Sequence, residues 1–181
     1  MPTALKLNRT LIDFIEVQPM FFVATAAPDG RVNLSPKGMD SLRVIDNKRI
    51  IWLNLSGSGN ETAAHVLEHP RMTLMFCAFK GDARILRVYG SARVTHPGDV
   101  AWPDLAPLFP EMAGSRQVFS LDVELVQTSC GTGVPMMDYR GQRGPEELLP
   151  FYEEMGKDGV QAYWERKNLV SIDGKPTGLK P

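Results

Sequence analysis

A short stretch at residues 55–72, LSGSGNETAAHVLEHPRM, combines glycines, hydroxyl side chains and the start of a small helix between segments of β character. Ser58 followed three residues later by Glu61 fits a capping box, and Asn60 is an equally suitable N-cap. The free backbone N–H groups and the dipole at such a helix start favour a bound anion, and the flanking glycines allow it to approach closely. Equally compatible with this stretch alone is a glycine turn that only connects strand and helix.

The motif NLSPKG at 33–38 is a second candidate for anion chemistry. Lys37 and Ser35 would direct a positive charge and a hydroxyl at a ligand, and Pro36 would interrupt the hydrogen bonding of a central strand. The alternative is an edge strand that proline and lysine protect from aggregation. Taken alone, the motif favours that structural role.

Two further segments place polar side chains in or after strands. In RILRVYG, Arg84 and Arg87 interrupt an apolar strand, so each needs an acidic partner or a bound anion, and a cross-strand ion pair is the commoner solution. The segment QTSCGTGVP, which closes the last predicted strand, is either a ligand-facing loop or an exit turn. Its Cys130 is more typical of a small inert residue than of a nucleophile.

Metal and hydrolytic chemistry find no support in the residue pattern. His65 and His69 are spaced i, i+4, but no third ligand lies near them in the sequence and the HExxH motif is absent. No Ser/His/Asp order and no paired catalytic carboxylates stand out. We therefore expect no metal and identify no catalytic residue.

The composition argues against highly charged and lipid partners. The 181 residues include 20 Lys and Arg and 21 Asp and Glu, a formal charge of −1, so nucleic acid and membranes are not expected partners. No run approaches the ~20 apolar residues of a membrane span, and the N-terminus lacks the apolar core of a signal peptide. The two cysteines lie outside any CxxC pair, which fits a reducing compartment. These features predict a cytoplasmic protein.

The periodicity predicts strands for most of the chain and helices at its ends. We expect one domain over 1–181, with an N-terminal helix over 8–18 and a helical extension over 145–170. Turn signals at 28–30 and 46–48 predict two hairpins, a third strand pair follows the small helix, and a long alternating strand completes the sheet. Six or seven antiparallel strands predict a mainly β fold, a small closed or partly open barrel with short flanking helices.

Taken together, three segments in this order resemble the pyridoxamine 5′-phosphate oxidase-like family: FFVATAAPDGRVNLSPKG, LNLSGSGNETAAHVLEHPRMTLMF and LRVYGSARV. The resemblance covers residues 20–95, and the strand ending LVQTSCGTGVP is similar to a smaller subgroup of the same family. It implies a six-stranded antiparallel Greek-key split barrel over 20–135 that binds FMN. It also implies a homodimer, with one FMN in each of two clefts between the subunits.

The resemblance assigns cofactor-binding roles to named residues. The SPKG strand would lie beside the flavin, and the loop at the helix start would cradle the phosphate, in agreement with the anion site that the helix start itself suggests. Arg87 would add a cation, and residues 127–130 would reach the cofactor from the partner subunit. The implied cofactor-binding set is Ser35, Lys37, Gly38, Ser58, Gly59, Asn60, Thr62, Arg87, Gln127, Thr128 and Cys130.

The chain departs from true pyridoxamine phosphate oxidases near its C-terminal end. Nothing after Gly141 resembles their substrate-binding motif GRLHDR, so the resemblance does not extend to the vitamin B6 reaction. The leading hypothesis is an FMN-dependent oxidoreductase that acts on a small substrate or electron donor. The alternative is a non-catalytic carrier of a flavin, a deazaflavin or a haem, with His65 or His69 as the haem ligand.

Overall fold

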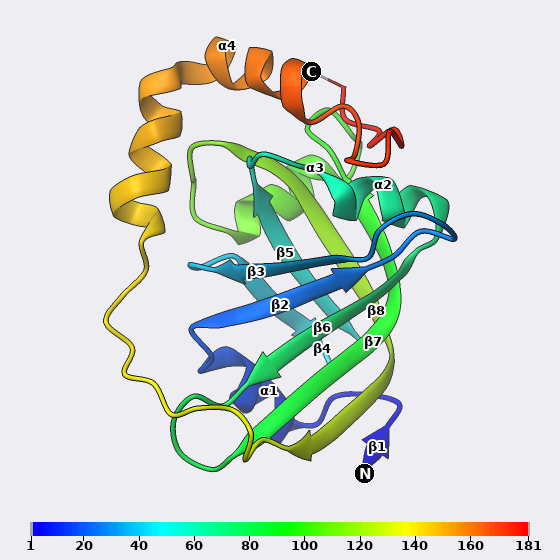
Figure 1. Ribbon diagram of the computed structural model, residues 1–181, viewed down its shortest axis with the longest axis vertical. Coiled ribbons are helices and arrows are strands. Elements are labelled where there is room, and N and C mark those ends of the chain that lie inside the picture. The colour runs from blue at the N-terminus through cyan, green and yellow to red at the C-terminus, as the bar shows by residue number, and fades with distance from the viewer. Residues whose placement is uncertain (1, 181) are drawn as a thin grey trace.

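The computed structural model describes residues 2–180, in which eight strands form one antiparallel sheet that curls into a half-barrel (Figure 1). The order across the sheet is β3-β2-β6-β7-β8-β5-β4, and β1 pairs with the C-terminal part of β8. The strands are β1 (Thr3–Ala4), β2 (Met20–Thr25), β3 (Asn33–Gly38), β4 (Leu42–Asp46), β5 (Arg49–Leu55), β6 (Arg71–Cys77), β7 (Arg84–Thr95) and β8 (Ser115–Cys130).

Short helical elements flank the sheet, and a longer helix follows it. They are α1 (Arg9–Glu16), α2 (Glu61–Glu68), α3 (Trp102–Leu105), the 3₁₀ turn η1 (Ala106–Leu108), the π-helical turn η2 (Gly144–Leu148) and α4 (Leu149–Lys167). α4 bends at Gly156 and arches over one end of the half-barrel (Figure 1). Between residues 2 and 180, none of these helices has the length and apolarity that a membrane span requires.

The three strand pairs expected from the sequence are confirmed. β2 with β3, β4 with β5, and β6 with β7 are antiparallel neighbours, and the first two pairs are joined by the segments that carry the turn signals at 28–30 and 46–48. The described sheet has eight strands rather than the six that the family resemblance implies. The periodicity predicts six or seven strands, and it misses β1 because two residues are too short to leave an alternating pattern in the sequence.

Strand β5 is buried on both faces, which accounts for its nearly continuous apolar sequence RIIWLNL. Trp52 lies in the main core inside the half-barrel, where its ring stacks on Phe119 with 4.5 Å between ring centroids. Ile51 and Leu53 point the other way and pack with Phe109 and its neighbours around α3 and η1. The outer layer formed by this segment lies at the end of the sheet over which α4 passes (Figure 1).

Two contacts attach α4 to the sheet. Tyr152 is buried against Gly114, where a Cβ would lie 2.5 Å from the tyrosine ring and where φ is +77°, so the position requires glycine. Trp164 Nε1 donates to Ser56 Oγ at 2.6 Å, and Ser56 Oγ donates to the carbonyl of Gly114 at 2.8 Å. Both contacts therefore hold α4 to the segments that follow β5 and precede β8.

The residues after α4 dock on α2 and on the turn between β2 and β3. Lys175 pairs with Asp29 at 2.6 Å and with Glu68 at 2.7 Å. Asp173 pairs with the Arg31 side chain and accepts a hydrogen bond from the Arg31 backbone N–H at 2.7 Å. The C-terminal segment thus ties the first hairpin to the small helix.

Candidate functional site

A β-bulge in β8 places an arginine at the centre of the candidate site. Asn54 of β5 is opposite Gln117 and Leu55 is opposite Ser115, so Arg116 is the extra residue of the bulge. A bulge re-aims side chains, and here the consecutive Arg116 and Gln117 both become buried instead of pointing to opposite faces. Arg116 Nε donates to Gln117 Oε1 at 3.2 Å, and its Nη1 donates to the carbonyl of Gly59 at 3.1 Å.

Lys37 of the SPKG motif joins the same network from the opposite wall. Along β3, Asn33, Ser35 and Lys37 point inward while the alternate residues point outward. Lys37 Nζ donates to Asn54 Oδ1 at 3.0 Å, and Asn54 Nδ2 donates to Gln117 Oε1 at 3.1 Å. The ammonium also lies 5.3 Å from the ring centroid of Trp52. Together, Lys37, Asn54, Arg116 and Gln117 form what we call the cation network.

The cation network carries two positive charges without a bound negative one. Among residues 2–180, no carboxylate lies within 4.0 Å of either Lys37 or Arg116. Burial, and then repulsion by Arg116, lower the pKa of Lys37 to about 8, against a smaller attraction by Glu61. Burial likewise lowers the pKa of Arg116 to about 10. Both groups are therefore cations at neutral pH, and an anion would stabilise them.

A second chain of hydrogen bonds links the SPKG strand to α2. Asn33 Nδ2 donates to Thr62 Oγ1 at 3.0 Å and to Thr25 Oγ1 at 3.3 Å. Ser35 Oγ donates to Asn33 Oδ1 at 3.0 Å. These bonds connect Ser35 with Thr62, while Arg116 separately reaches the carbonyl of Gly59.

The start of α2 differs from the expected capping box. The helix begins at Glu61, and the N-cap Asn60 makes no capping hydrogen bond with its side chain. Instead, buried Asn60 donates through Nδ2 to the carbonyl of Asn168 at 3.1 Å, and Glu61 accepts a hydrogen bond from the backbone of Ile172 at 3.3 Å. Ser58 stays exposed. The expectation fails because the C-terminal segment takes up both side chains, a competition that the local motif cannot show.

A cavity of about 580 Å³ opens beside this loop. A Cβ at Gly59 would lie 2.4 Å from the carboxylate at the end of the flexible Glu61 side chain, which would have to move, whereas a Cβ at Gly57 would meet nothing within 4 Å. The lining comes from β3, from the loop before α2 and from the C-terminal segment: Arg31, Val32, Asn33, Leu34, Ser58, Gly59, Glu61, Lys167, Val170, Ser171 and Ile172. The cavity thus has the exposed hydroxyl of Ser58 and two basic residues in its wall.

The remaining predicted residues lie on β7 and β8, away from the cation network. Arg87 and Gln127 are cross-strand partners on the outer face of the sheet. Arg87 Nη1 donates to Ser129 Oγ at 3.1 Å, so a hydroxyl takes the place of the expected acidic partner. Arg84 has no acidic partner within 4.0 Å among residues 2–180 either, and its guanidinium lies 5.4 Å from the ring centroid of Phe14.

Thr128 and Cys130 occupy the other face of β8. Their cross-strand partners are Leu86 and Arg84, and Leu86 belongs to the core, so these side chains alternate with Gln127. Cys130 is exposed, and the hydrogen bond between its Sγ and Thr132 lowers the pKa of the thiol. The predicted segment 127–130 is therefore divided between two faces of the sheet.

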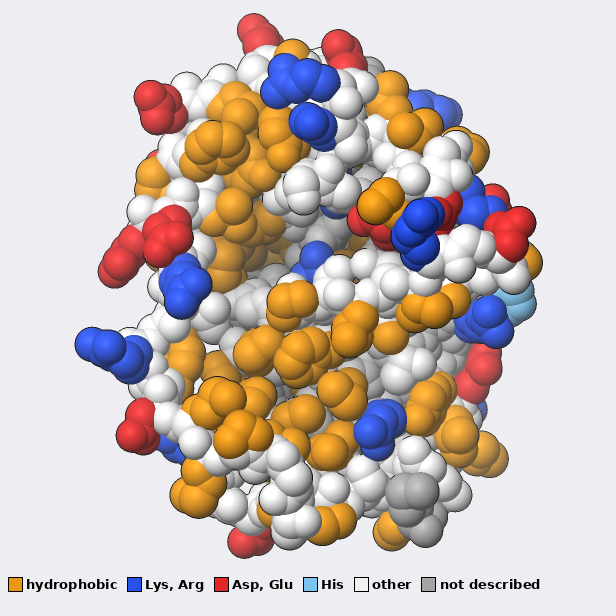
Figure 2. Space-filling view, viewed as in Figure 1, with side chains coloured by type: hydrophobic (Ala, Val, Ile, Leu, Met, Phe, Trp, Pro, Cys, Tyr) orange, Lys and Arg blue, Asp and Glu red, His pale blue; other side chains and the backbone are white. Residues whose placement is uncertain are grey.

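The outer face on which Arg87 lies is largely apolar. The strand register aligns Pro36, Phe22, Met75, Arg87 and Gln127 in one row across β3, β2, β6, β7 and β8. Figure 2 shows hydrophobic side chains gathered over β3, β2 and β6 on this face. We refer to this row and its surroundings as the outer apolar face.

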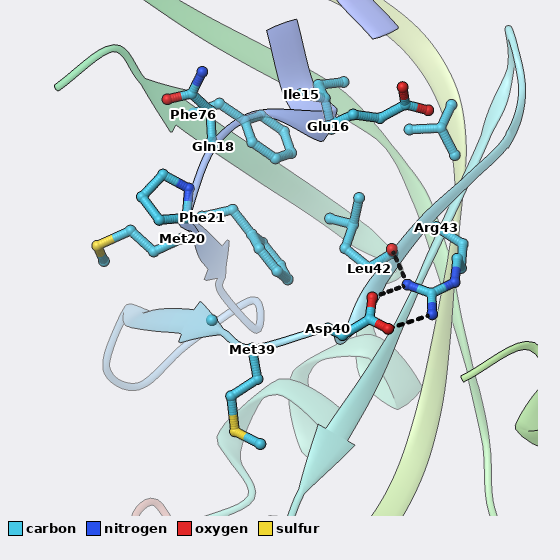
Figure 3. A pocket seen from close by; sticks show the side chains of 13 residues that line it. Ile15, Glu16, Gln18, Met20, Phe21, Met39, Asp40, Leu42, Arg43 and Phe76 are labelled. Atoms are coloured by element: carbon cyan, nitrogen blue, oxygen red, sulfur yellow. Dashed lines mark hydrogen bonds and ion pairs between the residues drawn. The ribbon is translucent and has the colours of Figure 1, made fainter. Parts of the chain in front are cut away.

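Gly38 lies apart from the cation network, in a pocket of about 240 Å³ between α1 and the start of β4 (Figure 3). Its basic residue is Arg43, which pairs with Asp40 through Nη1 to Oδ1 at 2.5 Å and Nη2 to Oδ2 at 3.0 Å. Glu16 adds a second carboxylate to the lining. Because the arginine is already neutralised, this pocket offers no site for an anion.

The histidines do not form a ligand set. His65 is fully buried, with Nδ1 hydrogen-bonded to Thr25 Oγ1 at 3.1 Å and with Nε2 unpartnered. Within residues 2–180, no group of three or more His, Cys, Asp or Glu side chains is placed to hold a metal ion.

Three members of the cation network were not predicted from the sequence. Asn54 interrupts the apolar RIIWLNL run, and a polar residue at a buried strand position is a usable signal. Arg116 and Gln117 lie before the regularly alternating part of β8, so the alternation does not predict that the side chain of Arg116 turns toward the site. Only the register shift reveals that both side chains turn toward the site.

Comparison with known proteins gives related sequences and similar folds. The sequence profile of the family described as pyridoxamine 5′-phosphate oxidase matches residues 7–130. The Aspergillus flavus protein ustO, described as a pyridoxamine 5′-phosphate oxidase family protein, is 36% identical over 186 residues, which cover 94% of this chain and 75% of ustO.

Two crystal structures are similar in fold. A Lactobacillus delbrueckii protein, provisionally described as a pyridoxamine 5′-phosphate oxidase, aligns with a TM-score of 0.55 at 23% identity, over 67% of this chain and 93% of its own. HupZ from Group A Streptococcus aligns with a TM-score of 0.53 at 21% identity, over 66% of this chain and 91% of its own. Both alignments support the curled antiparallel sheet as a split barrel.

Proposed function

Because this chain belongs to the pyridoxamine 5′-phosphate oxidase family, we propose that it binds FMN and transfers two electrons between the flavin and a small substrate. The observation that carries the proposal is the convergence of two motifs. Hydrogen bonds join Ser35 and Asn33 of β3 to Thr62 of α2, and Lys37 beside them has no carboxylate partner among residues 2–180. An anionic, planar cofactor supplies the charge that this region lacks.

The phosphate of FMN would be held where the cavity of about 580 Å³ meets the loop before α2. Ser58 offers a hydroxyl, the backbone at Gly59 is accessible to a ligand, and the helix dipole favours negative charge. Lys167 adds positive charge to the wall, whereas Arg31 is paired with Asp173 and Glu61 contributes a carboxylate. The Ser58 hydroxyl, the backbone at Gly59 and Lys167 are therefore the groups that would hold the phosphate.

Ser35 and Lys37 would lie beside the rest of the cofactor. When bound, FMN supplies the chemistry of accepting and donating hydride. The chain's part is to bind and orient the cofactor and to keep water out. Because its pKa is about 8, Lys37 holds a proton at neutral pH, so the ammonium stabilises negative charge on a neighbouring ligand.

We further propose that the functional unit is a homodimer that forms through the outer apolar face. A half-buried row that includes Phe22 and Met75 is an energetically poor surface for water and a suitable one for a second copy of the sheet. Arg87 and Gln127 lie in the same row, so in such a dimer they would face the partner. Thr128 and Cys130, on the other face of β8, would not face the partner in this arrangement.

Titration with FMN tests the binding proposal. We expect the purified protein to take up one FMN per chain. Quenching of flavin fluorescence and calorimetry measure this binding. Lys37→Met should weaken FMN binding about 10- to 100-fold, because a hydrogen bond to a charged group contributes about 1.5–3 kcal/mol. Lys48→Met is the matched control, since Lys48 is exposed in the turn between β4 and β5.

The outcomes separate binding from turnover. A protein that takes up no FMN overturns the proposal, and equal weakening by the two substitutions overturns the role of Lys37. Anaerobic addition of NADH or NADPH should bleach the bound flavin if the protein is an oxidoreductase. Because the GRLHDR motif is missing after Gly141, we expect pyridoxamine 5′-phosphate to be left unoxidised.

A further inference from the structure

A hollow lies between the arched α4 and the strands at the edge of the sheet, and basic side chains are visible at its bottom (Figure 2). Tyr152 of α4 packs on Gly114, two residues before Arg116, and Trp164 of α4 is hydrogen-bonded to Ser56, which itself bonds to the carbonyl of Gly114. Arg116 therefore lies close to the segment of β8 that α4 covers. Arg116 is only 2% exposed, so its charge belongs to the interior of the site and not to the solvent.

The guanidinium of Arg116 has donors to spare. Of its five N–H groups, one is donated to Gln117 and one to the carbonyl of Gly59, which leaves three. The acceptors that it does contact are neutral, and no carboxylate lies within 4.0 Å among residues 2–180. A single carboxylate matches the remaining donors in charge and in planar geometry.

The helix α4 contributes aromatic rings to the neighbourhood of this charge. The rings of Tyr152 and Tyr163 are 6.2 Å apart in an edge-to-face arrangement, and Trp164 is fixed by its hydrogen bond to Ser56. Trp102 and Leu105 of the α3 segment are partly buried and pack on the outer core cluster around Phe109. Such walls favour a flat, apolar body attached to the anionic group.

We propose that Arg116 anchors the substrate, and that the substrate is a small aromatic carboxylate held between the guanidinium and the aromatic residues of α4. The proposal rests on the proposed function, since FMN beside β3 would be the redox partner of the molecule in the hollow. It assigns the two charges of the cation network to different ligands, Lys37 to the cofactor and Arg116 to the substrate. It also gives α4 a role in specificity.

The test uses benzoate as the probe and benzamide as its uncharged counterpart. FMN content is first measured from the visible spectrum, and each probe is then titrated into the FMN-loaded protein by calorimetry. We expect benzoate to bind at least about tenfold more tightly than benzamide, because the amide cannot pair with the guanidinium. Acetate should bind more weakly than benzoate, because it lacks the ring.

Substitutions locate the binding group. In the FMN-loaded protein, Arg116→Gln should remove the preference for benzoate, and Arg116→Lys should keep only part of the preference. Arg93→Gln is the control, since Arg93 is 61% exposed on β7 and pairs with Asp122. Tyr163→Leu should weaken benzoate binding but not acetate binding.

Two results would overturn the inference, and a third would refute the proposed function on which it rests. Equal affinity of the wild-type protein for benzoate and benzamide refutes a carboxylate anchor. This comparison tests the inference even if Arg116→Gln fails to fold. Loss of FMN in a folded Arg116→Gln protein would show that the arginine holds the cofactor phosphate instead. Absence of FMN from the wild-type protein would refute the proposed function itself and is visible before any probe is added.

Discussion

Arg87 on the outer face of the sheet and Arg116 in the cation network have different surroundings. Arg87 is half-buried and donates to the hydroxyl of Ser129 at 3.1 Å. Arg116 is 2% exposed, donates to neutral acceptors and shares its surroundings with the ammonium of Lys37. A partly solvated arginine keeps water as its counterpart, whereas a buried one requires negative charge. The burial of the arginine, and not its residue type, therefore indicates that the cation network is the ligand site.

Disrupting the outer apolar face should have the largest effect. Phe22→Glu puts a carboxylate into the row shared with Pro36 and Met75. If this face is buried between two copies, an unpaired charge there costs about 3 kcal/mol or more, enough to shift the dimer dissociation constant more than 100-fold. We expect a monomer by size-exclusion chromatography with light scattering, and weakened FMN binding.

Val100→Glu is the control for that experiment, because Val100 is 98% exposed outside the sheet. A Phe22→Glu protein that keeps the wild-type dimer would show that the interface lies elsewhere. It would also separate Arg87 and Gln127 from the cofactor of the partner subunit.

The pH dependence of FMN binding tests whether Lys37 of the cation network faces the bound anion. In the free protein, Lys37 loses its proton as the pH rises through about 8, while bound FMN should keep the ammonium protonated to higher pH. FMN affinity should therefore fall above about pH 8, by up to about tenfold per pH unit. Titrations from about pH 7 to about pH 9 measure this slope.

Lys37→Arg should flatten the pH profile, because arginine remains charged throughout this range. Wild-type affinity that is flat across the same interval would mean that Lys37 does not face the bound anion. A slope retained in the arginine variant would assign the titration to another group.

The sequence predicts the fold better than it predicts the site. Alternation and turn residues locate the hairpins, because a strand with one buried face writes its period into the chain. The SPKG and GSGN motifs identify Lys37 and Gly59 because each carries its chemistry within a few residues. Arg116 escapes because a bulge breaks the period that identifies β8. Asn60 occupies the predicted N-cap position but makes no capping hydrogen bond, because its side chain donates instead to the carbonyl of Asn168, far along the chain.

Asn168 makes the contact between the C-terminal segment and the loop before α2. It is fully buried, its Nδ2 donates to the carbonyl of Gly57 at 2.9 Å, and its own carbonyl accepts from Asn60 and from Thr177 Oγ1. Asn168→Ala removes the first of these bonds and should destabilise the protein by about 1–2 kcal/mol. Urea unfolding measures the change.

Gln161→Ala, at an exposed position of α4, is the control and should stay within about 0.5 kcal/mol of the wild type. We also expect Asn168→Ala to weaken FMN binding a few-fold, since it loosens the loop that carries Ser58 and Gly59. Lower stability with unchanged FMN affinity would show that the C-terminal segment supports the fold but not the FMN site.

The pair of Asp173 with Arg31 should give the smallest effect. The Arg31 backbone N–H, and then its guanidinium, lower the pKa of Asp173 below its ordinary value of 3.8. A carboxyl whose pKa is lowered by folding stabilises the protein above that ordinary value, and this contribution is lost as the pH falls through the lowered pKa. Asp173→Asn should therefore lower the urea midpoint at neutral pH but not in strong acid.

Because Arg31 is 71% exposed, water and salt screen the pair, so the neutral-pH difference should shrink as salt is added. A difference that persists unchanged in acid would assign the effect to lost packing and not to the charge of Asp173.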